Sequence, residues 1–238
     1  MNKLLSVVRK AIDKYEMIED GDCIGVGVSG GKDSLCLLCA LGELKRFYPK
    51  AFTVKALMMD PCFFGRETEY GAIEELCRRL DIPCVIQRTR LYEIIFEVRQ
   101  EKNPCSMCAR MRRGILHDMA REQGCSKVAL GHNCDDAVET FFMNLLSGGK
   151  IGCFSPVTYL SRKDITVIRP LIYIPEKETV RVTEKYRLPV IQSPCPADGK
   201  TAREETKALV RQLEQKYGKI TEKTLGALER RGLDGWHI

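Results

Sequence analysis

The 238-residue sequence predicts an α/β fold: a parallel, twisted sheet with helices on both faces, an N-terminal helix and a C-terminal helical extension. Short apolar runs rich in β-branched residues alternate with stretches of helical period, which is typical of a parallel sheet covered on both sides. Beyond Pro189 this alternation gives way to a proline-rich turn and a charged helix. We therefore expect an N-terminal helix at 1–20, an α/β domain at 21–190 and a C-terminal segment at 191–238.

The expected elements follow one another in a regular order. Residues 1–16 place charges among apolar positions, as an amphipathic helix does. The expected strands are 23–28, 52–60, 83–89, 126–133 and 165–171, and the expected helices are 34–47, 69–80, 108–124, 135–146 and 201–218. Ligands of such sheets bind beyond the carboxyl ends of the strands. We therefore expect a site in the loops after Val28, Met59, Leu130 and Val167.

Charge and cysteine content narrow the class of protein. The 38 Lys and Arg against 32 Asp and Glu give a net charge of +6, which permits a polyanionic partner without requiring one. Residues 99–121 and 200–231 are the basic stretches. We see no run of about 18 apolar residues and no secretory signal, so we expect a cytoplasmic protein without a membrane span. In that setting, twelve cysteines indicate metal binding or thiol chemistry for some of them.

The tetrad Ser-Gly-Gly-Lys occurs twice, and its surroundings give the two copies different roles. Residues 29–32 follow a strand and open a helix, so backbone N–H groups and the positive end of the helix dipole converge on one point. This arrangement favours anion binding. Residues 147–150 instead end a helical run, where Gly148 and Gly149 are interpreted as the left-handed cap of the helix.

Two common nucleotide-binding motifs fit the first copy poorly. Gly25, Gly27 and Gly30 satisfy the spacing of a dinucleotide-binding fingerprint, but the first two fall inside the strand. The next candidate acid, Asp60, comes 30 positions after Gly30 instead of about 20. A Walker A loop requires Ser or Thr after its lysine, and Asp33 stands there.

The stretch SGGKDS resembles the PP-loop of the ATP pyrophosphatase superfamily. The SGGxDS pattern of that superfamily is intact at Ser29, Gly30, Gly31, Asp33 and Ser34. The glycines let the backbone approach phosphates, the hydroxyls can donate to them, and the carboxylate of Asp33 suits Mg²⁺. The stretch therefore predicts a site for ATP and magnesium, and the domain at 21–190 is expected to be a PP-loop ATPase domain.

The cysteines predict a second centre. Cys105 and Cys108 form a CxxC pair, which by itself fits a redox dithiol, half of a zinc site or half of an iron–sulfur site. Cys195, between two prolines, is a plausible third ligand, and three thiolates would leave one position of a cluster open. Its rivals are Cys62, Cys134 and Cys153, while Cys23, Cys36, Cys39, Cys77, Cys84 and Cys125 are interpreted as small hydrophobic residues.

Together, SGGKDS, CSMCARMRRG, LGHNCDD, NLLSGGK, VIRPL and Cys195 resemble the TtcA group of tRNA thiolases, the tRNA 2-thiocytidine synthetases, over about residues 25–195. The resemblance implies an enzyme that uses ATP and Mg²⁺ to adenylate the C2 oxygen of a cytidine in tRNA, after which sulfur displaces AMP. It also implies a [4Fe-4S] cluster held by Cys105, Cys108 and Cys195. The implied partners are tRNA, a sulfur donor (a cysteine desulfurase or sulfide) and a second copy of the chain in a homodimer.

The resemblance also implies roles for residues around the loop. Ser29 to Ser34 would hold the pyrophosphate, while Asp60, Gly131 and His132 would border the nucleotide. Because a carbonyl oxygen is a poor leaving group, its conversion to a phosphate ester makes displacement by sulfur feasible. Magnesium and Lys32 would stabilise the departing pyrophosphate.

Several polar residues near the loops have two interpretations. Asp135 is expected to orient metal or substrate, whereas Asp136 is explained at least as well as a helix N-terminal acid. His132 could equally be a packed loop histidine. The arginines beside the CxxC pair could neutralise tRNA phosphates; they are Arg110, Arg112 and Arg113.

Other functions stay open from the sequence alone. The same chemistry could act on a tRNA uridine or on a small molecule, although we find at neither end of the chain the extra CxxC or CxxH pairs of the related TtuA uridine thiolases. A zinc or redox CxxC module that binds a nucleotide is a different class, and zinc without labile sulfide would indicate it. A lysidine-type PP-loop ligase would have no use for three thiolates.

Overall fold

The computed structural model describes residues 1–99, 104–196 and 202–236. In this part of the chain, six strands form one sheet in the order β3-β2-β1-β4-β6-β5. The parallel strands are β1 (Asp22–Gly27), β2 (Phe52–Asp60), β3 (Cys84–Arg88), β4 (Lys127–Ala129) and β6 (Ile165–Ile168). The predicted parallel sheet is confirmed, except that an additional edge strand, β5 (Val157–Leu160), runs antiparallel to β6.

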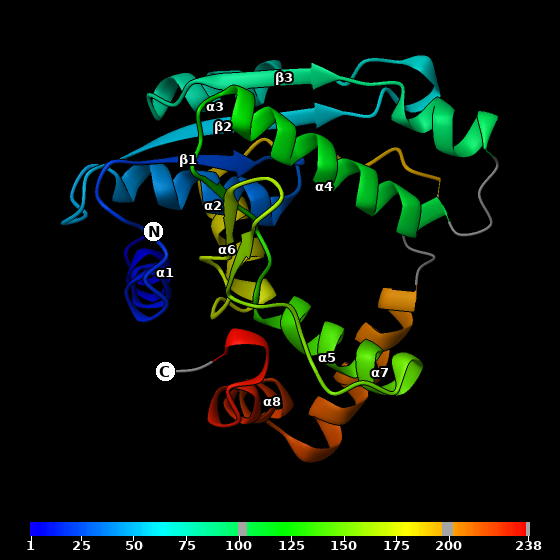
Figure 1. The fold of residues 1–238 in the computed structure, drawn as a ribbon. Helices are drawn as coiled ribbons and strands as arrows, with labels where there is room; N and C mark the ends of the chain where they lie inside the picture. The colour runs from blue at the N-terminus through cyan, green and yellow to red at the C-terminus, as the bar shows by residue number, and fades with distance from the viewer. Residues whose placement is uncertain (100–103, 197–201, 237–238) are drawn as a thin grey trace.

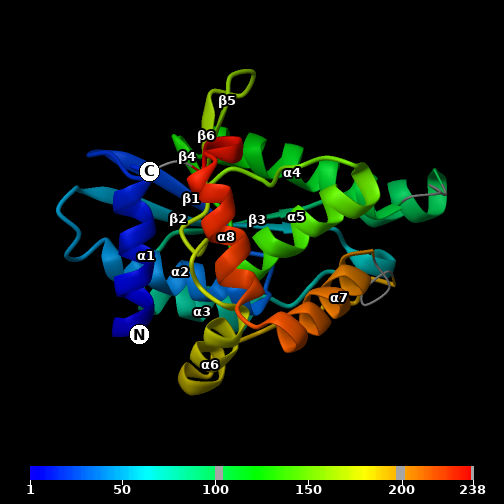
Figure 2. The ribbon, with the colours of Figure 1, turned by 90° about the horizontal axis from the view of Figure 1, so that it is seen from below.

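Helices cover both faces of the sheet. Figure 2 shows α2 (Lys32–Leu44) and α3 (Gly71–Arg79) on one side and α4 (Pro104–Glu122) on the other. Side chains of β2 point alternately to the two faces of the sheet. Met58 packs in the apolar core on the α2 side. Leu57 and Met59 pack in a second core on the α4 side, together with Met119 of α4. The period of two in a strand buried on both faces therefore produces two apolar layers.

The remaining helices lie around this sheet. They are α1 (Asn2–Lys14), α5 (Cys134–Gly148), α6 (Glu176–Tyr186), α7 (Ala202–Tyr217) and α8 (Ile220–Arg230), with short turns at η1 (Phe63–Gly65), η2 (Glu93–Val98) and η3 (Leu233–Gly235). Helices α5, α7 and α8 lie together below the sheet in Figure 1. The sequence pattern did not predict α6 or α8. Trp236 packs the end of the described chain into the core. Its indole is fully buried, and its Nε1–H donates to the carbonyl oxygen of Phe154 at 2.8 Å.

The second Ser-Gly-Gly-Lys copy ends a helix, as predicted. Gly149 has φ of +58° at the end of α5, and its N–H donates to the carbonyl oxygen of Asn144. The site therefore belongs to the first copy, at the start of α2.

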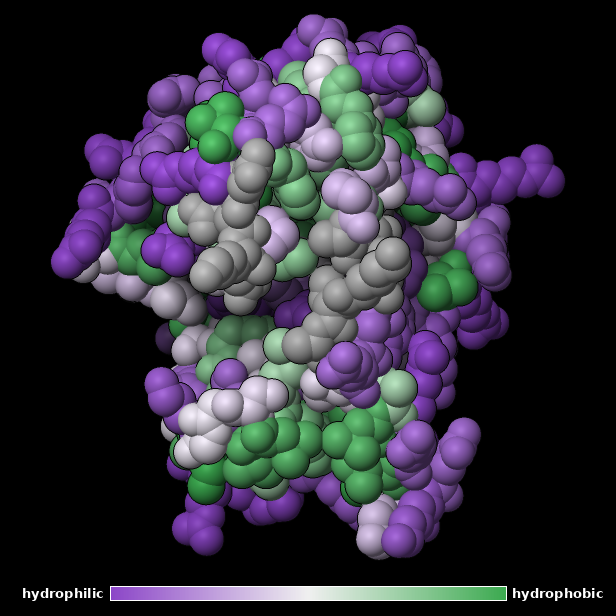
Figure 3. All heavy atoms as spheres, turned by 90° about the vertical axis from the view of Figure 1, so that its right-hand side faces the viewer, coloured by the Kyte–Doolittle hydropathy of each residue, from purple (hydrophilic) through white to green (hydrophobic). Residues whose placement is uncertain are grey.

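One face of the molecule carries an apolar area. Figure 3 shows apolar side chains gathered over the carboxyl end of α5, where Leu145, Leu146 and Ile151 are exposed. In the described part of the chain no helix has the length and apolar character needed to cross a membrane.

Candidate active site

The loop between β1 and α2 turns sharply at Gly30, whose φ of +83° lies in the left-handed region. A Cβ there would lie 3.1 Å from the Cβ of Ile191, and Ile191 donates its N–H to the carbonyl oxygen of Gly30 at 3.0 Å. Gly31 is the N-cap of α2, which receives no side-chain cap within the described residues. The N–H groups of the first turn therefore remain available to bind an anion.

Two hydroxyl groups shape this loop. Ser34 Oγ donates to the carbonyl oxygen of Gly31 at 2.8 Å and accepts the N–H of Ser29 at 3.2 Å. Ser29 Oγ accepts the N–H of Gly31 at 3.3 Å and lies 3.3 Å from Ser34 Oγ. The hydroxyls thus lie side by side at the positive end of α2, where they can donate to a phosphate.

Residues from distant parts of the chain contact Lys32 and Asp33, the two charged residues of the loop. Asp33 Oδ1 accepts from Thr179 Oγ1 at 2.5 Å and from Asn133 Nδ2 at 3.3 Å, and its Oδ2 binds Lys32 Nζ at 2.9 Å. Glu176, at the start of α6, also binds Lys32 Nζ at 2.9 Å. Burial alone would lower the pKa of Lys32, but these two carboxylates raise it above the ordinary 10.5. Lys32 is therefore cationic at physiological pH.

Glu176 connects the loop to the C-terminal part of the chain. Its carboxylate also binds Lys207 of α7, with the shorter contact at 2.7 Å. Burial raises the pKa of Glu176, but Lys207 and Lys32 outweigh burial and lower it below 4.5. Glu176 is not among the residues that the sequence motifs predicted for the site. The signal for it was Pro175 followed by two acids within the first turn of a helix.

Gly131 is in close contact with the backbone of the first turn of α2. A Cβ at Gly131 would lie 3.0 Å from both the carbonyl carbon of Asp33 and the backbone nitrogen of Ser34. The adjacent His132 packs on Phe154, with ring centroids 4.9 Å apart. Burial lowers the pKa of His132 to about 3, so the imidazole is neutral at physiological pH.

Asp60 lies fully buried at the carboxyl end of β2, beside β1, as the sequence predicted. Its carboxylate accepts the N–H of Cys62 at 3.0 Å, the N–H of Thr68 at 2.8 Å and the hydroxyl of Thr68 at 2.9 Å. These bonds fix the loop that follows β2. The predicted contact of Asp60 with a nucleotide stays a prediction.

The two acids after the β4 loop have different partners. Asp136 forms a capping box with Asn133, because each backbone N–H donates to the other's side chain at 3.0 Å, and it also binds Arg203 at 3.0 Å. Its interpretation as a helix N-terminal acid is confirmed. Asp135 accepts the N–H of Glu176 at 2.6 Å and so holds the start of α6 beside the loop. A direct role of Asp135 in orienting metal or substrate stays a prediction.

The CxxC pair lies on the first turns of α4, which begins four residues earlier than expected, at Pro104. Cys105 is exposed, whereas Cys108 and Cys195 are partly buried. Burial raises the pKa of Cys108, Arg112 lowers it, and the thiols of Cys195 and Cys105 raise it further. Cys195 therefore lies within electrostatic range of Cys108.

A single metal ion and an iron–sulfur cluster need different spacings of the thiols. Among the described residues, no three Cys, His, Asp or Glu side chains lie close enough to hold one metal ion. The cysteine ligands of a [4Fe-4S] cluster bind different irons and are therefore spread farther apart. Cys134 and Cys153 are buried, and Cys62 lies in the loop after β2. The interpretation of Cys36, Cys39, Cys77 and Cys125 as buried residues is confirmed.

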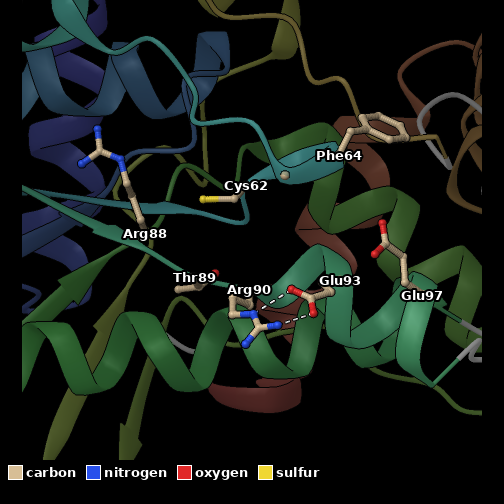
Figure 4. Close-up of a pocket in the computed structure, with 8 residues that line it drawn as sticks. Cys62, Phe64, Arg88, Thr89, Arg90, Glu93 and Glu97 are labelled. Carbon is tan, nitrogen blue, oxygen red and sulfur yellow. Dashed lines mark hydrogen bonds and ion pairs between the residues drawn. The ribbon is translucent and has the colours of Figure 1, made fainter.

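A pocket of about 470 Å³ lies beyond the carboxyl ends of β2 and β3 (Figure 4). Arg90 pairs with Glu93, and Arg88 pairs with Glu67 at 2.8 Å. Both arginines of this pocket are thus paired with carboxylates, and the loop at Ser29–Ser34, which leads into the N-terminus of α2, remains the candidate for ATP. The lining residues are Cys62, Phe64, Gly65, Arg88, Thr89, Arg90, Glu93 and Glu97.

Known proteins share this arrangement of sequence and fold. The family profile described as the PP-loop domain matches residues 4–213. The chain belongs to the PP-loop family. This PP-loop protein is 39% identical over 229 residues to the tRNA-cytidine(32) 2-sulfurtransferase of Pelobacter propionicus, covering 95% of this chain and 84% of that one. It is 36% identical over 224 residues to the enzyme of the same name from Citrifermentans bemidjiense, covering 93% and 87%. Within the family it therefore belongs with the tRNA-cytidine(32) 2-sulfurtransferases, and the predicted resemblance is confirmed.

Solved structures share the fold. The U34-tRNA thiolase NcsA from Methanococcus maripaludis, solved with its [4Fe-4S] cluster, matches with a TM-score of 0.77 and 26% identity, covering 95% of this chain and 77% of that one. The NH3-dependent NAD synthetase from Campylobacter jejuni matches with a TM-score of 0.50 and 17% identity, covering 93% and 86%. The second match reflects the fold.

Proposed function

We propose that this protein is an ATP-dependent, [4Fe-4S]-dependent tRNA sulfurtransferase that converts cytidine 32 to 2-thiocytidine. The observation that carries the proposal is the intact PP-loop at the start of α2, in a chain 39% identical to a tRNA-cytidine(32) 2-sulfurtransferase over 95% of its length. The division into an N-terminal helix (1–20), a PP-loop ATPase domain (21–190) and a C-terminal segment with the third cysteine (191–238) is part of the proposal.

The PP-loop binds the phosphates of ATP in this proposal. The N–H groups of the first turn of α2 and the hydroxyls of Ser29 and Ser34 donate to phosphate oxygens. Lys32 stabilises the charge that develops on the leaving pyrophosphate, because the ion pair with Glu176 keeps it cationic and oriented. Asp33 holds Mg²⁺, which neutralises the phosphates when bound.

The reaction has two displacements. In the first, the C2 oxygen of the cytidine forms a bond to the α-phosphorus of ATP while the bond from that phosphorus to pyrophosphate breaks. In the second, sulfur at the oxidation level of sulfide bonds to C2, and the bond from C2 to the oxygen breaks with AMP as the leaving group. Both displacements conserve electrons when the donor is sulfide, whereas a persulfide delivered by a cysteine desulfurase would need two electrons from a thiol to reach the sulfide level.

The residues proposed to hold the cluster are Cys105, Cys108 and Cys195. The CxxC pair on the first turns of α4 and the electrostatic effect of Cys195 on Cys108 support this set. Bound there, a [4Fe-4S] cluster supplies one iron without a cysteine ligand, at which sulfur can be presented. Replacement of any of the three by Ser should abolish the bound iron and labile sulfide measured in anaerobically purified protein. Cys153→Ser is the matched control, and a full cluster in the Cys195→Ser variant would remove Cys195 from the ligand set.

The function is tested by mass spectrometry of nucleosides from total tRNA of cells with and without this gene. We expect 2-thiocytidine to disappear in the deletion strain and to return with the wild-type gene but not with Asp33→Asn. Persistence of every thionucleoside would contradict a tRNA substrate.

Thiolation of a tRNA uridine is the second candidate, supported by the likeness to the U34-tRNA thiolase NcsA. Loss of 2-thiouridine with retention of 2-thiocytidine would select it. The sulfur donor, a cysteine desulfurase or free sulfide, the homodimer and the cytoplasmic location belong to the proposal as well. Gel filtration of the holoenzyme and sulfur transfer with each donor test them.

A further inference from the structure

Two buried nitrogen atoms next to the active site have no hydrogen-bond partner among the described residues. They are Nδ1 of His132, in the loop after β4, and Nε of Arg169, directly after β6. The two strands are neighbours, with Ala129 opposite Ile168. Phe154 lies against both side chains, 4.9 Å from the ring centroid of His132 and 5.0 Å from Cζ of Arg169. Buried polar atoms without partners are costly, so their grouping here indicates a missing ligand.

Arg169 has a buried Nε with no hydrogen-bond partner among the described residues. Its Nη1 donates to the carbonyl oxygen of Ser155 at 2.6 Å and lies 3.3 Å from Thr158 Oγ1. These contacts use one end of the guanidinium group and fix its plane. The opposite edge, formed by Nε and Nη2, is one that can bind a phosphate through two parallel hydrogen bonds. The side chain as a whole is only partly buried.

The charges that act on His132 are positive. Burial lowers the pKa of His132 most, and Arg169, Arg203 of α7 and Arg113 of α4 lower it further. Arg203 is compensated by Asp136. Within the described ranges, neither Arg113 nor Arg169 forms an ion pair. The group therefore combines two uncompensated guanidinium groups with a neutral imidazole, which suits an anion.

We propose that Arg113, His132 and Arg169 bind a phosphodiester group of the tRNA backbone beside the nucleotide that enters the PP-loop site. This inference rests on the proposed function. The triphosphate of ATP is accounted for by the loop after β1, whereas Arg169 follows β6, two strand spacings or about 10 Å away in the sheet. That separation is of the order of the distance from base to phosphate within one nucleotide. Gly131 joins the two sites, because it contacts the start of α2 and precedes His132.

The test measures binding of an unmodified tRNA transcript to the cluster-loaded protein over a series of salt concentrations. Arg113→Gln is the main variant, because Arg113 is exposed and its replacement leaves the core intact. Arg121→Gln, also exposed on α4, is the matched control. The Arg113 variant should bind tRNA severalfold more weakly, and the slope of log affinity against log salt should fall by about 0.7 to 0.9, as for one lost phosphate contact. The control should keep the wild-type slope.

A second variant and a second ligand distinguish the outcomes. Arg169→Lys keeps the charge but loses the edge formed by Nε and Nη2, so tRNA affinity should fall. Because Nη1 also bonds Ser155, binding is measured well below the Tm of the variant. Affinity for ATP without tRNA should stay at the wild-type value in both variants. Equal tRNA binding by wild type, Arg113→Gln and Arg121→Gln would overturn this inference alone, as would a loss confined to ATP. Failure of the wild-type protein to bind tRNA would overturn the proposed function with it.

Discussion

Gly131 should be intolerant of even one added methyl group, because its neighbour is the backbone of the PP-loop helix. In Gly131→Ala the new Cβ would start 3.0 Å from the carbonyl carbon of Asp33 and 3.0 Å from the nitrogen of Ser34. A comfortable contact begins near 3.4 Å, so the first turn of α2 and the loop after β4 must separate by about 0.4 Å. Flexible side chains could absorb such a shift, but these atoms belong to the main chain that positions Asp33 and Ser34.

Two effects should follow from that separation. Overpacking should destabilise the protein by about 1–3 kcal/mol, or roughly 3–10 °C in Tm for a chain of this size. Displacement of the loop by a few tenths of an ångström should slow the formation of pyrophosphate in the presence of tRNA by about 10- to 100-fold, because catalytic groups tolerate little misplacement. Affinity for ATP should fall as well.

The assay compares pyrophosphate release and ATP binding of Gly131→Ala with Gly114→Ala. Gly114 lies inside α4 with nothing within 4 Å of its hypothetical Cβ, so alanine there should be neutral or slightly stabilising. If Gly131→Ala matched the wild type in Tm, ATP affinity and rate, the close approach of the β4 loop to α2 would be refuted.

Three further predictions follow from single residues. Gly149→Ala should lower the free energy of unfolding by about 1 kcal/mol without changing ATP affinity. Gly30→Ala should lose ATP binding, because Gly30 has φ of +83° and a Cβ there would lie 3.1 Å from Ile191. Equal effects of the two variants on ATP binding would contradict the different roles of the two Ser-Gly-Gly-Lys copies. Glu139 is buried with its pKa raised to about 7 by burial, so ionisation costs stability as the pH rises from about 4.5 through 7. Glu139→Gln should therefore stabilise the protein by at most about 3 kcal/mol at pH 8 and by little at pH 5, and a pH-independent difference in thermal unfolding would contradict this. Glu176→Gln should instead destabilise the protein at neutral pH. The pKa of Glu176 lies below 4.5, so its ion pairs stabilise the fold by about 1–2 kcal/mol when it is ionised. The difference in stability from wild type should vanish as the pH falls through that lowered pKa.

The parts of the site that depend on neighbouring residues in the chain could be predicted from the sequence. The turn at Gly30 and the start of α2 follow from a strand, two glycines and a helix within twelve residues, and the cap at Gly149 follows from a glycine after an apolar helix. The interpretation of Asp136 as a helix N-terminal acid needed only its position after Asn133.

Long-range contacts could not be predicted in this way. Asp33 is held by Thr179, and Lys32 by Glu176, across more than 140 residues of chain. No periodicity or motif specifies that α6 packs its first turn against the PP-loop, since this depends on how the whole sheet is assembled. The antiparallel β5 is a different case: the polar turn before Ile165 and the alternation on either side of it are the signal of a hairpin.

The fate of the oxygen atom lost from cytidine tests the central claim most directly. A tRNA carrying ¹⁸O at C2 of cytidine 32 would be thiolated by the holoenzyme with ATP and sulfide, and the products analysed by mass spectrometry. Adenylation of that oxygen by the PP-loop predicts ¹⁸O in AMP, one atom for each 2-thiocytidine formed. Label found in inorganic phosphate or in water, with none in AMP, would contradict activation at the α-phosphorus of ATP.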